Sequence, residues 1–323
     1  MKDKVDLFYD LFDKAAMLYY QSLGLDYYEA FLKVVDGIIN GNIDSRLSDQ
    51  DTLMLEEIYN EIVTKEFYNE EIRLASELLL IKAFKHLKFP LDLMTPDVVN
   101  YLLISLINGL FPDSPIRLLD TALGTGNMLF ALHHNFRGEA ELIGIEKDER
   151  LVKLAQALSE LQSSELTIYS QEALKEVYES VEIVVGDLDA YLLEDNLLLD
   201  NPLYQKGVRY FPYLLVAARL VNIKPGGYFI YLINNDFFSQ PKNEIFKDYL
   251  ENKANLGLIA LPETMFQKGH PGRSILIGKK VEGSSNDILI IEIPSLKKES
   301  LKNSLDKIQI MIERISEEKK CIK

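Results

Sequence analysis

The chain has 323 residues, long enough for roughly two domains, and its apolar content of 47% is ordinary for a globular protein. Its formal charge of −15 and its pI near 4.8 disfavour sequence-independent binding to nucleic acid, because such binding depends on Lys and Arg displacing phosphate counterions. The single cysteine, Cys321, excludes a disulfide framework and a thiolate metal cluster.

The first residues have acids spread among their apolar positions and lack the apolar core of a signal peptide. No segment approaches the ~18 uninterrupted apolar residues of a membrane-spanning helix. The sequence therefore predicts a cytoplasmic protein without a membrane span, and a reducing compartment also fits the lone cysteine.

Residues 5–87 carry apolar side chains at intervals of three and four, without the alternation typical of strands. This periodicity predicts a bundle of about four helices. The candidate helix caps are Asp44, Ser48 and Asn69. The same helices carry acids that we expect to form a surface repelling a duplex: Glu56, Glu57, Glu61, Glu70 and Glu71.

A further helix is predicted from Pro96 to Asn108, with Thr95 as its N-cap and Pro96 at its first position. The pattern changes just before it, near Phe89-Pro90. We therefore expect a helical N-terminal domain over residues 1–93 and a second domain over residues 94–323.

Short apolar strands alternate with helical stretches after Pro115. This alternation predicts an α/β fold with a doubly wound, mostly parallel, Rossmann-like sheet. Only residues 281–286 separate the last two strands, which predicts an antiparallel edge, and residues 296–319 predict a charged terminal helix. The predicted strands are residues 116–120, 141–146, 165–170, 181–187, 226–234, 256–262, 273–280 and 287–294.

The most informative segment is Asp120-Thr121-Ala122-Leu123-Gly124-Thr125-Gly126-Asn127, where an apolar strand runs into a glycine-rich turn and then a helix. Glycine permits close approach of a ligand to the backbone, and the following helix offers free N–H groups. The spacing is neither the G-x-G-x-x-G of dinucleotide folds nor a phosphate loop. Hydride and phosphoryl transfer are therefore disfavoured.

Acidic residues stand at or just after the ends of four successive strands. In an open α/β sheet the ligand lies beyond the carboxyl ends of the strands, so these residues are candidates for a site. Glu146, followed by Lys147, comes about twenty residues after the glycines, where a carboxylate accepts from both ribose hydroxyls of a nucleoside. The four acids are Asp120, Glu146, Glu172 and Asp187.

This arrangement resembles the class I S-adenosylmethionine-dependent methyltransferases. Residues 94–280 are most similar to the adenine-specific (N-6) DNA methylases, namely the modification subunits of type I restriction systems and their small stand-alone bacterial relatives. The turn at residues 120–126 is similar to the family's Asp-Pro-Ala-x-Gly-x-Gly, with Thr121 where proline is usual. Thr95-Pro96 is similar to the family's Thr-Pro element. The family's late strand-loop-strand signature is similar to residues 261–266 together with residues 274–277.

The resemblance implies a methyltransferase sheet that binds S-adenosylmethionine. It implies that Asp120 receives the methionine ammonium, Glu146 the ribose and Glu172 the adenine edge. The implied cofactor-binding set is Thr95, Pro96, Asp120, Thr121, Ala122, Gly124, Gly126, Asn127, Glu146, Lys147, Glu172 and Asp187. A cup of carboxylates complements the cofactor's sulfonium and ammonium, and no Lys or Arg occupies the turn.

The catalytic motif departs from the family pattern, an Asp/Asn-Pro-Pro-aromatic tetrad at the end of the fourth strand. Here Asp187 is retained as the candidate catalytic residue, but Leu188-Asp189-Ala190 replaces the prolines and the aromatic residue, and Tyr191 comes one residue late. A closer match, Asn201-Pro202-Leu203-Tyr204, is the tetrad if residues 197–199 are the fourth strand instead of residues 181–187.

Three functions remain open on the sequence. The chain is an active methyltransferase for an amino nitrogen, an inactive S-adenosylmethionine-binding module, or a methyltransferase for a protein or small-molecule acceptor. The acceptor is not identified: the resemblance implies nucleic acid, and the acidity disfavours it. The helical domain is expected to form a substrate wall or a homodimer surface.

The histidines do not predict rival chemistry. His133-His134 reads as a helix end, since no Cys or further His stands at the spacing of a metal site. His270 lies in a glycine-containing loop, where the alternatives are a simple loop and closure over a substrate.

Overall fold

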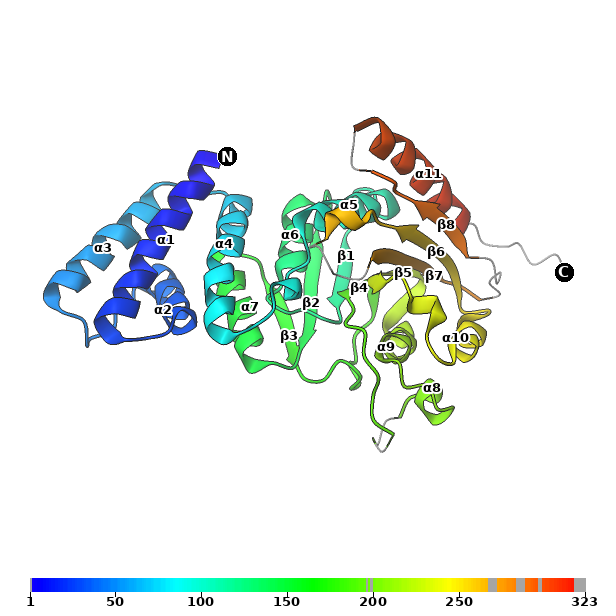
Figure 1. Cartoon of the computed structure of the whole chain (residues 1–323). Helices are drawn as coiled ribbons and strands as arrows, with labels where there is room; N and C mark the ends of the chain where they lie inside the picture. Colours follow the sequence, from blue (N-terminus) through cyan, green and yellow to red (C-terminus); the bar gives the residue numbers. More distant parts are fainter. Residues whose placement is uncertain are drawn as a thin grey trace. The chain divides into compact units, whose positions relative to one another are not determined.

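The computed structural model describes residues 2–195, 197, 200–266, 272–282, 288–295 and 298–316 (Figure 1). The chain divides into two compact units. Unit 1 comprises Met1–Asn100, Leu123–Asn135 and Glu146–Ser170, and unit 2 comprises Tyr101–Ala122, Phe136–Ile145 and Gln171–Lys323. The chain therefore passes from unit 2 to unit 1 within the glycine-rich turn, between Ala122 and Leu123.

Four helices form the first part of unit 1 and confirm the predicted bundle: α1 (Lys2–Leu23), α2 (Tyr27–Asn40), α3 (Asp49–Thr64) and α4 (Asn69–Leu87). Their apolar faces enclose an aromatic core in which the Phe12 and Phe31 rings lie 4.8 Å apart. Asp26 begins α2 with a capping box, since its carboxylate accepts from the Glu29 amide at 2.8 Å and the Glu29 carboxylate accepts from the Asp26 amide at 3.3 Å.

One of the three predicted caps is confirmed. Ser48 caps α3, its hydroxyl accepting from the Asp51 amide at 3.1 Å. Asp44 was wrong as a cap, because it lies in the turn before α3 and accepts from the Arg46 guanidinium at 2.9 Å. Asn69 was wrong by one position, since α4 already begins at Asn69 and its N-cap is Tyr68.

Two of the five acids predicted to form a repelling surface are committed to local structure instead. Glu71 is buried, and its carboxylate accepts from the Tyr68 amide at 3.0 Å, which closes the first turn of α4. Glu70 pairs with the buried Arg73 at 2.8 Å. The acids of α3 are exposed as predicted: Glu56, Glu57 and Glu61.

The remainder of unit 1 consists of α6 (Asn127–Asn135), α7 (Glu149–Leu161) and β3 (Leu166–Ser170). Helix α6 packs against α4, and α7 packs against α2 and α4. The Arg150 guanidinium of α7 lies 4.5 Å from the centre of the Phe89 ring, a cation–π contact that joins α7 to the segment after α4.

The described strands form one eight-stranded sheet in the order β3-β2-β1-β4-β5-β7-β6-β8. Strand β1 pairs in parallel with β2 and β4, and β4 pairs in parallel with β5, so the predicted mostly parallel, doubly wound sheet is confirmed. The strands other than β3 are β1 (Ile116–Asp120), β2 (Ala140–Glu146), β4 (Val181–Asp187), β5 (Ile223–Asn234), β6 (Ala254–Ala260), β7 (Arg273–Lys280) and β8 (Leu289–Glu292).

The predicted antiparallel edge is wrong in its placement. The antiparallel strand is β7, which lies inside the sheet between β5 and β6, whereas the edge strand β8 runs parallel to β6. Burial explains this order: Ile275, Leu276 and Ile277 of β7 are fully buried, as an interior strand requires, whereas Ile290 of β8 is 68% exposed. Of the short connection between β7 and β8, residues 283–287 lie outside the described residues.

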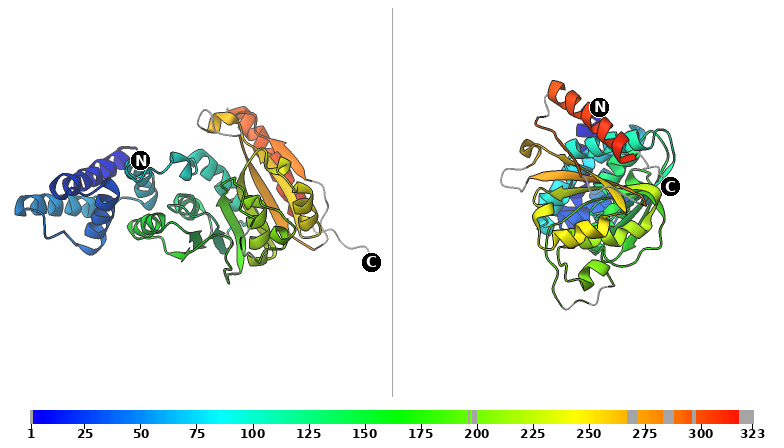
Figure 2. Two further views of the ribbon diagram at one scale, coloured as in Figure 1. Left: turned by 60° about the horizontal axis from the view of Figure 1, so that its bottom comes forward. Right: turned by 90° about the vertical axis from the view of Figure 1, so that its right-hand side faces the viewer.

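The later helices of unit 2 cover both faces of its strands. Helix α11 (Lys298–Ser316) packs on β6, β7 and β8, and α9 (Phe211–Arg219) packs with α10 (Asn243–Leu250) on the opposite side (Figure 2). The helix predicted from Pro96 is α5 (Asp97–Leu110). Cys321 and the ends of the predicted terminal helix lie outside the described residues. Within the described ranges, no helix is long and apolar enough to cross a bilayer.

Candidate functional site

Two glycines give the turn after β1 its shape. Gly124 and Gly126 have φ angles of +56° and +79°, in the left-handed region that glycine adopts without strain. A Cβ at Gly126 would lie 2.8 Å from the Phe130 ring, whereas a Cβ at Gly124 would meet only the Leu93 carbonyl oxygen, at 3.5 Å. Gly126 is therefore required by conformation and by packing, and Gly124 by conformation alone.

Glu146, the last residue of β2, braces this turn. One carboxylate oxygen accepts from the Gly124 amide at 2.9 Å, and the other accepts from the amides of Lys147 and Asp148 at 2.8 Å each. Burial raises the pKa of Glu146, although the three amides favour its ionised form. A carboxylate accepts about four hydrogen bonds, so roughly one position is left for a ligand hydroxyl. This capacity is smaller than acceptance from both ribose hydroxyls requires.

The first residues of the turn belong to unit 2 and are fixed there. Asp120 is fully buried, and one of its carboxylate oxygens accepts from the Ala122 amide at 2.9 Å. Thr121 donates its amide and its hydroxyl to the Val185 carbonyl of β4, at 3.0 and 3.1 Å. Thr121, which stands where the resembled family has proline, therefore anchors the turn by hydrogen bonds in place of a rigid ring.

Unit 1 holds buried polar atoms without a hydrogen-bond partner among the described residues. One of them, the Thr125 hydroxyl oxygen, lies in the glycine turn itself. Buried polar groups are costly unless a ligand or water pairs with them. Thr95 belongs to the same unit and is buried. The carbonyl of the next residue, Pro96, accepts from the Asn100 amide at 3.1 Å.

These features of unit 1 fit the groups of S-adenosylmethionine. The two glycines of the left-handed turn leave its backbone uncovered by a Cβ, the unpaired Thr125 hydroxyl offers a hydrogen bond, and Glu146 offers a carboxylate oxygen. The described turn brings no cationic side chain that would favour a phosphate instead.

The end of β4 carries an ion pair. The Arg273 guanidinium donates to the Asp187 carboxylate and, at 3.1 Å, to the Leu232 carbonyl. Asp187 lies opposite Leu232 of β5, and Arg273 lies opposite Asn234 of the same strand, so the sheet brings the two charges together. Sequence reasoning missed Arg273, because its place beside Asp187 depends on β7 lying next to β5. The predicted acid is present, and its charge is neutralised.

The alternative tetrad is a helix cap. The Asn201 side-chain oxygen accepts from the amides of Leu203 and Tyr204 at 3.0 and 3.3 Å, and its nitrogen donates to the Leu214 carbonyl at 3.0 Å. This begins the short helix α8 (Pro202–Gln205). Residues 181–187 are the fourth strand, as predicted, whereas Leu198 and Leu199 of the competing run lie outside the described residues.

Glu172 lies in the loop after β3, close enough to Tyr191 for their charges to interact. Burial, then the charges of Glu172 and Asp189, raise the pKa of Tyr191 to about 12. The Tyr191 ring is 40% exposed and stacks on Phe211, with ring centres 4.5 Å apart and planes at 14°. An aromatic surface therefore follows the end of β4, although not at the family's position.

His133 and His134 occupy the last turn of α6, which confirms a helix end. The His134 side chain bonds Ser164 at 3.0 Å and lies 3.4 Å from the Glu70 carboxylate. Among the residues that the structure describes, no three His, Cys, Asp or Glu side chains are grouped to hold a metal ion. His270 lies outside the described residues.

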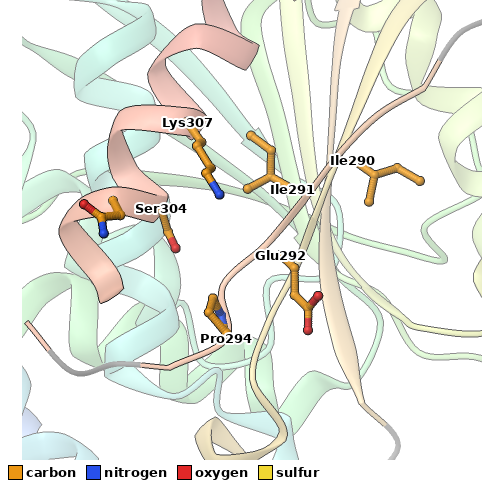
Figure 3. Close-up of a pocket in the computed structure, with 7 residues that line it drawn as sticks. Ile290, Ile291, Glu292, Pro294, Ser304 and Lys307 are labelled. Atoms are coloured by element: carbon orange, nitrogen blue, oxygen red, sulfur yellow. The ribbon is translucent and has the colours of Figure 1, made fainter. Parts of the chain in front are cut away.

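A hollow of about 400 Å³ opens between β8 and α11 of unit 2 (Figure 3). Glu292 and Lys307 are its charged side chains, and Ile290 and Ile291 supply apolar surface. The full lining is Ile290, Ile291, Glu292, Pro294, Asn303, Ser304 and Lys307. None of the candidate site residues that were named from the sequence lines this hollow.

The order of the strands and the similarity of the chain to solved structures define the fold as that of the class I methyltransferases. The chain superposes on a Listeria monocytogenes protein assigned to the class I S-adenosylmethionine-dependent methyltransferases, with a TM-score of 0.79 and 23% identity over 98% of this chain and 100% of that one. It superposes on the type I restriction-modification system methyltransferase subunit from Streptococcus thermophilus with a TM-score of 0.63 and 13% identity, over 95% and 73% of the two chains.

Two sequence comparisons point to a more particular relative. Residues 6–84 match the family model of the YtxK N-terminal helical domain. The chain is 27% identical over 272 residues to the uncharacterized protein YtxK of Bacillus subtilis (strain 168), covering 82% of this chain and 83% of that protein. The similarity therefore includes both the helical region and most of the sheet.

Proposed function

We propose that this chain binds S-adenosylmethionine at the glycine turn and transfers its methyl group to an amino nitrogen, in the manner of the N-6 adenine methylases that the sequence resembles. The observation that carries the proposal is the left-handed turn at Gly124 and Gly126, braced by Glu146 and accompanied by the unpaired buried hydroxyl of Thr125. The bound cofactor would supply a methyl group activated by a sulfonium, and the neutral thioether would leave with the electron pair of the broken C–S bond.

The proposed contacts follow the chemistry of each group. Glu146 accepts from one ribose hydroxyl with its remaining oxygen position. Asp120, a buried carboxylate, receives the methionine ammonium, and Glu172 meets the adenine edge. The methionine end also contacts Thr95-Pro96, and the backbone of the turn lines the cofactor.

On the acceptor side, Asp187 orients the amino nitrogen. Asp187 is already paired with Arg273, and because a carboxylate accepts about four hydrogen bonds, an N–H donor can share it with the guanidinium. An amine held in this way directs its lone pair towards the methyl group, and orientation is the main contribution that such a residue makes to a displacement reaction. The proton of the product then passes to solvent.

The acceptor class follows from the resemblance rather than from a surface of this chain. The formal charge is −15, and the exposed Glu56, Glu57 and Glu61 add negative charge to α3. We therefore expect no salt-sensitive binding to random duplex DNA by the isolated chain. Submicromolar retention of a plain duplex at physiological salt in a gel-shift assay would contradict this and favour a restriction-type substrate.

Transfer of a labelled methyl group tests the proposal. The purified chain is incubated with tritiated S-adenosylmethionine and fractionated extract from a strain that lacks it, followed by nuclease or protease digestion. We expect label in an acceptor fraction, and we expect its rate of appearance to fall about 100-fold with Asp187→Ala. Label retained by the Asp187→Ala variant at the parental rate would show that the acceptor is oriented elsewhere.

A second candidate function is a binding module that holds S-adenosylmethionine without transferring its methyl group. The neutralised Asp187 and the absence of the two prolines favour it. Cofactor binding with no label in any fraction would establish the binding module and overturn the proposed transfer.

A further inference from the structure

Arg73 of α4 is a buried arginine at the centre of a polar cluster within unit 1. Its side chain is 1% exposed. It makes two bonds of 2.8 Å to Glu70 on its own helix and one of 2.7 Å to Glu77, also on α4. The remaining bonds reach two other segments: Asp97 at 2.9 and 3.1 Å, and the Asn127 side-chain oxygen at 3.0 Å.

The two distant partners flank the segments proposed to hold the cofactor. Asp97 follows Thr95-Pro96 directly and begins α5, and Asn127 follows Gly126 directly and begins α6. One guanidinium nitrogen donates to both. A residue of the helical region that matches the YtxK domain model thus fixes the starts of both helices.

Backbone bonds connect these helix starts to the proposed site. The Asn100 amide donates to the Pro96 carbonyl at 3.1 Å, and the Phe130 amide donates to the Gly126 carbonyl at 2.9 Å. If Asp97 and Asn127 shift, these first turns open, and the Thr95-Pro96 element and the glycine turn lose their conformation.

The electrostatics make the cluster sensitive to a change of cation. Burial acts to lower the pKa of Arg73, but its bonds to Glu70 and Asp97 raise the pKa overall, so the guanidinium stays charged. Burial, together with the negative charge of Asp97, raises the pKa of Glu77 to about 7, although the positive charge of Arg73 acts to lower it. A guanidinium presents five donors in a fixed plane, and a lysine in its place has neither the number nor the spread to reach all four partners.

We propose, on the basis of the proposed function, that Arg73 is a positioning residue of the cofactor site: by holding Asp97 and Asn127 together it keeps the Thr95-Pro96 element and the glycine turn in the conformation that binds S-adenosylmethionine. The helical N-terminal region thereby controls cofactor affinity without touching the cofactor.

The test compares Arg73→Lys with a matched control, Arg117→Lys. Arg117 also bridges two carboxylates, Glu141 and Glu179, but it does so at the first residues of β1, away from its carboxyl end. Both substitutions keep the charge. The first readout is amide hydrogen exchange at Asn100 and Phe130 in the protein without ligand, and the second is the affinity for S-adenosylmethionine by calorimetry.

In Arg73→Lys we expect exchange at both amides to quicken and affinity to fall at least tenfold, and in Arg117→Lys we expect neither change. Parental exchange rates in a folded Arg73→Lys variant would overturn the inference whether or not the parent binds the cofactor. Quickened exchange with parental affinity would also overturn it. If the parent binds no S-adenosylmethionine, the proposed function is overturned, and the link from Arg73 to cofactor affinity is overturned with it. The exchange data alone still decide whether Arg73 holds the two helices.

A second folded variant guards against a purely structural explanation. Glu77→Gln keeps one side-chain oxygen as an acceptor for Arg73 and removes the titrating charge. We expect it to retain parental exchange at Asn100 and Phe130 and parental affinity. A tenfold loss of affinity in Glu77→Gln would show that cluster charge, and not the geometry imposed by Arg73, sets cofactor binding.

Discussion

The glycine turn and the end of β4 differ in how their carboxylates are paired. At the turn, backbone amides bond Glu146, which keeps roughly one oxygen position, and the Thr125 hydroxyl lacks a partner among the described residues. At β4, Asp187 is paired with Arg273, and Asn201 downstream is satisfied at both ends of its amide. Backbone amides bond Glu146 without cancelling its charge, whereas the charge of Asp187 is neutralised by a guanidinium.

The largest expected effect comes from filling the turn. We expect Gly126→Val to lower the free energy of unfolding by ~2–5 kcal/mol, from a left-handed φ and overpacking against Phe130, and to abolish detectable cofactor binding. Denaturant titration and calorimetry measure the two effects.

Gly226→Val is the matched control. Gly226 also has a left-handed φ, +76°, but a Cβ there has nothing within 4 Å. We expect its free energy of unfolding to fall by only ~1–2 kcal/mol, the cost of a left-handed backbone conformation for valine. We expect it to bind the cofactor as the parent does. Equal loss of binding in both variants would mean that general instability, and not the turn, explains the result.

Substitution at the end of β4 is expected to affect turnover alone. Asp187→Ala should lower kcat about 100-fold while leaving cofactor affinity nearly unchanged, because misplacement of an acceptor costs rate rather than cofactor binding. Single-turnover kinetics and calorimetry on the same preparation separate the two quantities.

Asn201→Ala provides the comparison for Asp187. We expect parental turnover and a loss of ~1 kcal/mol in unfolding free energy, the usual cost of removing an N-cap. Full activity in Asp187→Ala together with inactive Asn201→Ala would reverse the assignment of the two residues.

A smaller loss of affinity is expected at the brace of the turn. Glu146→Ala should weaken binding of S-adenosylmethionine by ~1.5–3 kcal/mol, the range for hydrogen bonds to a charged group. Glu141→Ala, on the same strand and paired with Arg117, should leave affinity unchanged. Parental affinity in Glu146→Ala, measured by calorimetry, would remove Glu146 from the site.

A pH dependence of stability is expected at Glu77. Its pKa is about 7 in the folded protein and 4.5 ordinarily, so protonation stabilises the fold below pH 4.5, and this stabilisation is lost as the pH rises to 7. Glu77→Gln mimics the protonated form, so we expect it to match the parent at pH 4 and to exceed it by ~1–3 kcal/mol at pH 8. A constant difference between the two proteins in denaturant titrations at both pH values would contradict the shifted pKa.

The sequence predicted those parts of the fold that depend on local pattern. The helices before residue 88, the parallel strands and the strand at residues 181–187 follow from periodicity and β-branching. The order of the last strands does not follow from such patterns, because the insertion of β7 between β5 and β6 is a long-range pairing that no local signal specifies. The boundary between domains at residues 93 and 94 stays a prediction.

Within the candidate site, spacing located the glycine turn and Glu146, but not the cations. Arg73 and Arg273 reach Asp97, Asn127 and Asp187 only through tertiary structure. Spacing also overstated Asn201-Pro202-Leu203-Tyr204, since a string that resembles a catalytic tetrad has the same composition as a helix N-terminus with Asn as cap and Pro at its first position.

Calorimetric titration of the unmodified chain with S-adenosylmethionine and with its demethylated product tests the central claim most directly. We expect saturable binding of both ligands at one site per chain and a melting temperature that rises with ligand concentration. No heat with either ligand at millimolar concentration, together with an unchanged melting temperature, would contradict it.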